Sequence, residues 1–277
     1  MAPTEPGFAA KFPILSLARM EWRIGWRTAA FRLVCLCALL FGWSMGGTQG
    51  RGAALSAYTT AEAAWQYLGF VAIVWMSLVA IRETTARTAI LVFSKPQPGE
   101  RIALAKFLGG FLQVLTFLLA LFLGSLCARL ISGGGLLGVE AYGMQYARAA
   151  GVLFFASSAS FALALLFDNA LAGALVGLYW IMTMAGKAFL AKFYFPAYSQ
   201  NLAAFLALGL GLLTLTLLLY RRARRGDARP ALWVRYGAPL CFLFAGWWIW
   251  SAIRYGYGTR YYSRSIREHD WKTRQAK

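Results

Sequence analysis

The sequence predicts an all-α membrane protein that crosses the bilayer several times, and three observations support this fold class. Of the 277 residues, 60% are hydrophobic and 14% are charged, whereas a soluble domain carries about 25% charged residues. The mean hydropathy is +0.55. Several windows of about 18–22 residues are almost free of charge, which is long enough for a helix to cross a hydrocarbon core of about 30 Å.

The first expected element is an amphipathic helix at residues 14–32. Its bases recur at four- and five-residue spacing, at Arg19, Arg23, Arg27 and Arg32. Two tryptophans lie among them, and tryptophan favours the depth of the lipid headgroups. The pattern predicts a helix that lies in the membrane interface. The alternative is that this segment is only the flank of the first span.

Seven apolar runs follow, and each is a candidate membrane span. The sixth and seventh are separated by a basic loop, and a tight turn is expected at residues 168–169, where Asp-Asn is favourable turn chemistry. The seventh run is one of the two shortest and is rich in tryptophan, so a half-buried hairpin is an alternative there. We place the spans at residues 33–50, 63–81, 107–128, 148–167, 170–188, 200–220 and 236–253.

Lysine and arginine concentrate in alternate connections between these runs. Residues 1–32, 82–106 and 221–235 are rich in bases, whereas the connections between them carry few. The positive-inside rule therefore predicts that the N-terminus and both basic loops face the cytoplasm. The tail at residues 254–277 is also basic. Either the seventh run does not cross, or it crosses and the tail is exported despite its charge, which is the outcome we expect.

The chain lacks the common motifs of catalysis and nucleotide binding. It has no phosphate-binding loop, zinc-protease motif, Cys-x-x-Cys pair or nucleophile elbow. We therefore predict no catalytic, cofactor or metal site and no enzyme activity. The spans hold almost no ionisable residues, which argues against a proton-coupled carrier. The net charge of +18 indicates anionic lipid rather than nucleic acid, because the bases lie between apolar runs. Energy for transport would have to come from another subunit.

The basic segment at residues 82–106 carries the most specific pattern. Glu83 precedes Thr88 by five residues, Pro96 follows Thr88 by eight, and Lys106 follows Pro96 by ten. On these residues and spacings the chain resembles the ABC-2-type transporter permeases. In that family an acid, a Gly-Thr pair, a proline and a Gly-Lys pair mark the cytoplasmic segment between the second and third spans.

Two positions depart from the family pattern, since Arg87 and Ala105 stand where a glycine is usual. The order of elements agrees with the family over roughly residues 14–222. The resemblance is greatest to the small permeases of the copper-site maturation and gliding-motility type. It implies a six-span core like that of type V exporters, with an amphipathic N-terminal helix. The expected seventh span and the tail are additional to this six-span core.

The resemblance also implies roles for particular segments. Residues 84–95 would form a short helix that couples an ATPase to the spans, although an ordinary polar loop is the alternative. Residues 187–200 would form a re-entrant outer element, broken by a proline. The implied coupling residues are Glu83, Arg87, Thr88, Leu91, Phe93, Pro96, Arg101 and Lys106; those of the outer element are Lys192, Tyr194 and Pro196.

Small residues predict where helices approach closely, and they could lie between two permease subunits. They are Gly42, Gly46 and Gly47 in the first span and Gly173 and Gly177 in the fifth. The alternative is the ordinary glycine content of membrane helices.

The resemblance implies a permease subunit of an ATP-driven exporter in the bacterial cytoplasmic membrane. Residues 1–32 would form the cytoplasmic N-terminus, 33–222 the transmembrane domain, 223–253 a basic loop with the seventh span, and 254–277 the tail. The expected partners are an ABC ATP-binding subunit that holds ATP and Mg²⁺, a second permease, anionic lipid, and a periplasmic or extracellular protein at the tail. The alternative is a mechanotransmitting scaffold or an accessory subunit that transports nothing.

Overall fold

The computed structural model describes residues 13–46, 60–61, 64–85, 99–132, 139–184 and 198–224. Within these ranges the chain is helical apart from short turns, and no strand occurs. The elements are α2 (Pro13–Arg27), α3 (Ala29–Gly46), the π-helical turn η1 (Ala64–Leu68), α5 (Gly69–Thr85), α7 (Gly99–Ile131), α8 (Val139–Phe167), α9 (Ala170–Met184) and α11 (Tyr198–Arg224). The predicted all-helical class is confirmed for this part of the chain.

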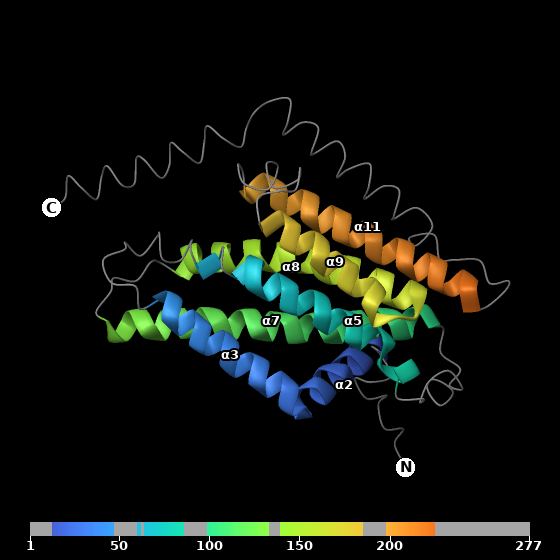
Figure 1. Cartoon of the computed structure of the whole chain (residues 1–277), viewed down its shortest axis with the longest axis horizontal. Coiled ribbons are helices and arrows are strands. Elements are labelled where there is room, and N and C mark those ends of the chain that lie inside the picture. The colour runs from blue at the N-terminus through green and yellow to red at the C-terminus, as the bar shows by residue number, and fades with distance from the viewer. Residues whose placement is uncertain are drawn as a thin grey trace, which may run out of the picture.

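Five helices, α5, α7, α8, α9 and α11, run lengthwise in a bundle and alternate in direction (Figure 1). The last turn of α5, the first turn of α7, the turn between α8 and α9 and the last turn of α11 lie toward one end, which we name the α5–α7 end. The last turns of α3 and α7 lie toward the opposite end. This alternation is the arrangement that a chain crossing a membrane repeatedly would require.

Three of the described helices are long and apolar enough to cross a membrane. They are Ala29–Gly46, Glu100–Ile131 and Gln145–Phe167. Shorter apolar stretches occupy Gln66–Arg82 and Phe205–Leu218. Helices therefore occur in six of the seven predicted runs, and the seventh run, residues 236–253, lies outside the described residues.

The predicted amphipathic helix at residues 14–32 is divided in two. The carbonyl of Gly25 accepts a bond from the Thr28 amide at 2.9 Å, which closes the last turn of α2. The Thr28 hydroxyl oxygen accepts from the amide of Phe31 at 3.2 Å and so caps the first turn of α3. Arg32 consequently belongs to α3 rather than to the amphipathic helix.

The predicted turn at residues 168–169 is confirmed. Asp168 has a φ of 51°, a left-handed conformation that aspartate tolerates better than most residues. The side-chain oxygen of Asn169 accepts from the amide of Leu171 at 2.9 Å and caps the start of α9.

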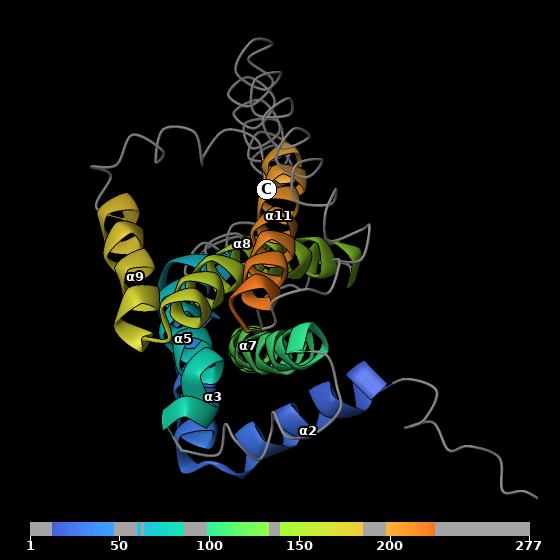
Figure 2. The same cartoon turned by 90° about the vertical axis from the view of Figure 1, so that its right-hand side faces the viewer.

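The core forms around α7, which packs against α2, α3, α5, α8 and α11. In Figure 2, α7 is seen nearly end-on, with α2 below it and α11 above it. Its buried face carries Phe107, Phe117, Leu118 and Leu121, all at most 1% exposed. Helices α2, α3, α5, α8 and α11 are therefore positioned by their contacts with α7, whereas α9 packs on α5 and α8.

Candidate functional site

Helix α2 lies crosswise to the bundle (Figure 2) and crosses α7 near the α5–α7 end (Figure 1). Its buried residues are Ala18, Glu21 and Gly25, which follow the i, i+3, i+7 spacing of one helix face. A Cβ atom at Gly25 would overlap the side chain of Gln113, and one at Gly109 would lie 2.7 Å from the carbonyl oxygen of Ala18. The two helices therefore pack in close contact.

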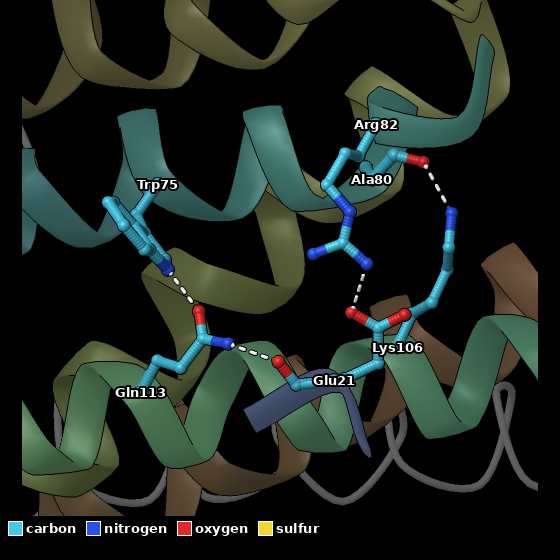
Figure 3. A network of polar contacts seen from close by, with 6 residues as sticks. All are labelled: Glu21, Trp75, Ala80, Arg82, Lys106 and Gln113. Atoms are coloured by element: carbon cyan, nitrogen blue, oxygen red, sulfur yellow. Dashed lines mark hydrogen bonds and ion pairs between the residues drawn. The ribbon is translucent and has the colours of Figure 1, made fainter. Parts of the chain in front are cut away.

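A chain of polar contacts joins α2 to α5 and α7 (Figure 3). The side chain of Arg82 on α5 donates to the carboxylate of Glu21 at 2.5 Å. The amide nitrogen of Gln113 on α7 donates to the backbone oxygen of Glu21 at 2.8 Å. The indole nitrogen of Trp75 on α5 donates to the side-chain oxygen of Gln113 at 2.5 Å. We call these four residues, Glu21, Trp75, Arg82 and Gln113, the three-helix network.

The network is largely inaccessible to solvent. Glu21 is 5% exposed and Gln113 is 1% exposed, whereas the Arg82 side chain is 34% exposed. Buried polar groups are costly unless they are hydrogen-bonded, and both ends of the Gln113 amide have a partner. The network is thus a specific connection and not a loose polar surface.

Lys106 lies beside the network and closes the same end of the bundle. It is 4% exposed, and its ammonium group donates to the backbone oxygen of Ala80 at 3.3 Å. Lys106 and Arg82 both lie near the C-terminal end of α5, where positive charge interacts favourably with the helix dipole. Figure 3 shows Lys106 reaching from α7 to the Ala80 carbonyl on α5, whereas Arg82 extends from α5 toward Glu21.

Aromatic rings fill the space between α2, α3, α5 and α7. Phe31 is fully buried, and its ring centroid lies 5.2 Å from Trp26, 6.0 Å from Trp75 and 5.0 Å from Phe117. Trp75 and Phe117 meet edge to face at 5.3 Å, a geometry that stabilises aromatic pairs. Trp75 thus connects this cluster to the three-helix network.

The structure places three of the residues predicted for coupling. Glu83 lies in the last turn of α5, Arg101 is exposed in the first turn of α7, and Lys106 is buried one turn further on. The predicted helix at residues 84–95 begins within α5 and otherwise lies outside the described residues. The remaining predicted site residues, Arg87, Thr88, Leu91, Phe93, Pro96, Lys192, Tyr194 and Pro196, also lie outside them.

Four of the predicted packing glycines make close contacts within one chain, and Gly47 lies outside the described residues. A Cβ atom at Gly42 would overlap the backbone oxygen of Leu121, and one at Gly46 would overlap that of Ser125. A Cβ atom at Gly173 would overlap the hydroxyl of Ser77 on α5. At Gly177 the nearest atom would be in the Phe70 ring, at 3.3 Å. Their use between two subunits remains a prediction.

Three residues of the network, Glu21, Trp75 and Gln113, were not expected from the sequence. Signals for two of them are present. Glu21 is the sole acid of a helix whose other charges are arginines, and Gln113 is an amide inside a strongly apolar run. Polar residues within membrane helices commonly bond to a neighbouring helix. The sequence does not indicate which helix that neighbour would be.

The network marks a definite depth along α7. Residues 113–131 of α7 extend about 27 Å at about 1.5 Å per residue, close to the hydrocarbon thickness of about 30 Å. Residues 99–108 of the same helix continue past the level at which α2 crosses. The site can thus hold α2, α5 and α7 together near the end of the bundle where α5 ends and α7 begins.

Among the described residues, no group of three His, Cys, Asp or Glu side chains could hold a metal ion. No protein-family model matches the chain, and no curated protein is similar to it at a significant level.

Proposed function

We propose that the protein is the transmembrane permease subunit of an ATP-driven ABC-2-type transporter in a bacterial cytoplasmic membrane, with its N-terminus in the cytoplasm. A separate ATP-binding subunit would hydrolyse ATP, and a second permease chain would complete the assembly. The helical bundle with apolar helices supports this proposal, as do the family-like spacings at residues 82–106.

The proposal rests mainly on one observation. The two helices that flank residues 86–98, α5 and α7, are both anchored by polar contacts near these residues. On the α5 side, Arg82 binds Glu21 of the crosswise helix α2. On the α7 side, Lys106 binds the backbone of α5. A force applied to residues 86–98 by an ATPase would therefore act on α2, α5 and α7 together. A connecting loop without a mechanical role would not require such anchors.

The first test is purification of the tagged full-length chain from its own host, followed by identification of bound proteins by mass spectrometry. A phosphate-loop ATPase is expected to co-purify in a stoichiometric ratio, because the sequence itself contains no phosphate-binding loop. Absence of such an ATPase under several mild detergents would overturn the proposal.

The second test compares paired variants in the reconstituted complex. Leu91→Ala is expected to lower the stimulation of ATPase activity by about tenfold, roughly 1.4 kcal/mol of coupling. Leu130→Ala, an exposed leucine at the opposite end of α7, is the matched control and is expected to leave it unchanged. Equal effects of the two substitutions would contradict a coupling role for residues 86–98.

A further inference from the structure

We propose that the outer face of α2 is a binding surface for anionic phospholipid, formed by Arg19, Arg23 and Arg27. These residues recur every four positions and are all exposed, so they form one stripe along the helix. The proposal concerns the lipid around this chain and does not depend on the proposed transport function.

The first argument is the direction of the stripe. Ala18, Glu21 and Gly25 face α7 and are buried. At about 100° per residue, the arginine stripe is centred on the opposite side of the helix. The guanidinium groups are therefore directed away from the bundle. Helix α2 lies crosswise to α7 (Figure 2). In a bilayer that the bundle crosses lengthwise, α2 would therefore lie along the membrane surface, where its arginines would reach the lipid headgroups.

The second argument is the charge that this surface retains. Glu21 is the sole acid of α2, and it is paired on the inner side with Arg82. The acid is thus removed from the outer surface, which carries positive charge alone. A basic surface at the depth of the headgroups attracts anionic lipid by about 1 kcal/mol for each arginine.

The third argument is the apolar side chains beside the arginines. Leu15 and Met20 are each 50% exposed, Trp26 is 49% exposed and Ile24 is 37% exposed. Large apolar groups combined with arginine on one short helix are typical of a membrane interface, where the apolar groups enter the acyl boundary. An acidic soluble protein would match the charges but would leave these side chains in water.

The test uses quenching of Trp26 fluorescence by brominated lipid. The full-length chain is placed in phosphatidylcholine nanodiscs that contain either brominated phosphatidylglycerol or brominated phosphatidylcholine at the same mole fraction. The Trp26 signal is the difference between the wild-type chain and its Trp26→Phe variant. Stronger quenching by the phosphatidylglycerol is expected, and it should weaken as salt is added. Equal quenching by both lipids overturns the proposal.

Charge variants then locate the preference on the stripe. Arg23→Gln is expected to lower the relative affinity for phosphatidylglycerol about fivefold, and the triple Arg19→Gln, Arg23→Gln, Arg27→Gln variant about a hundredfold. Arg23→Lys should retain the preference because the charge is kept. Arg101→Gln, an exposed arginine on α7, is the matched control. A loss with Arg101→Gln as large as that with Arg23→Gln would assign the effect to total charge and refute the stripe.

Discussion

Helix α7 makes two contacts with the N-terminal part of the chain, and they are built on different principles. Against α3, glycines bring backbone onto backbone, since Gly42 and Gly46 lie under the carbonyls of Leu121 and Ser125. Gly124 on α7 completes the contact from the other side, where an added Cβ would overlap the carbonyl of Leu39. Against α2, a backbone carbonyl also approaches closely at Gly109, but side-chain hydrogen bonds add to the contact, from Gln113 to the Glu21 carbonyl and from Trp22 to the Thr116 hydroxyl.

The difference determines which contact can change without unfolding. A backbone carbonyl cannot turn aside, so the α3–α7 contact allows one distance of approach. Hydrogen bonds between side chains can be exchanged for others at a modest net cost of about 0.5–1.5 kcal/mol each. The hydrogen-bonded part of the α2–α7 contact is therefore suited to adjustment, and the α3–α7 contact, where three glycines meet backbone carbonyls, is suited to holding the first candidate span in place.

The largest effect is expected from Gly42→Ala. The added methyl group would overlap the backbone oxygen of Leu121, and overpacking costs about 1–3 kcal/mol or more when the surroundings cannot move. We expect a loss of about 3 kcal/mol in the free energy of unfolding, measured by denaturant titration in detergent.

The matched control for this substitution is Gly143→Ala on α8. No atom lies within 4 Å of a Cβ at Gly143, so the variant should gain the usual helix preference of alanine over glycine, about 0.5–1 kcal/mol. A Gly42→Ala protein as stable as Gly143→Ala would show that α3 and α7 can separate, and the contrast between the two contacts would be lost.

An intermediate effect is expected from Gln113→Leu. The leucine removes both hydrogen bonds of the Gln113 amide. The Trp75 indole then lacks this acceptor, and the Glu21 carbonyl lacks this donor. A buried group left unsatisfied costs about 1–3 kcal/mol, so we expect a loss of about 2 kcal/mol in the same titration.

A second substitution tests this interpretation. Adding Trp75→Phe to Gln113→Leu removes the stranded indole donor, so the double variant should be less destabilised than the sum of the two single variants. Strict additivity would mean that the bond between Trp75 and Gln113 does not contribute to stability.

The sequence predicts most helices because apolar runs and turn chemistry are local signals. The turn at Asp168 and Asn169 follows from residues that tolerate a left-handed backbone and cap a helix. Helix α7 begins earlier than the span predicted at residues 107–128. Glu100, Arg101 and Lys106 interrupt the apolar run, but charged residues do not end a helix, and α7 continues back to Gly99, next to Pro98.

The three-helix network could not be predicted because its bonds join distant parts of the chain. Glu21 and Gln113 are 92 residues apart, and nothing local to either specifies the other. The break at Thr28 was missed for a different reason. A threonine cap leaves a weak signal in sequence when apolar and basic residues continue on both sides of it.

The smallest effect is expected from Trp22→Phe, which tests how rigid the α2–α7 contact is. The Trp22 indole donates to the hydroxyl of Thr116 at 3.4 Å, a long bond, and that hydroxyl already donates to the Leu112 carbonyl at 2.8 Å. Phenylalanine keeps most of the ring, so the expected loss is about 0.5 kcal/mol. Trp75→Phe is the same chemical change at a position whose acceptor, Gln113, is buried, and it should cost several times more. If Trp22→Phe and Trp75→Phe lower the free energy of unfolding by the same amount, the contact that Trp22 makes with α7 is as firm as a buried one. Helix α2 could then not serve as the adjustable contact of α7.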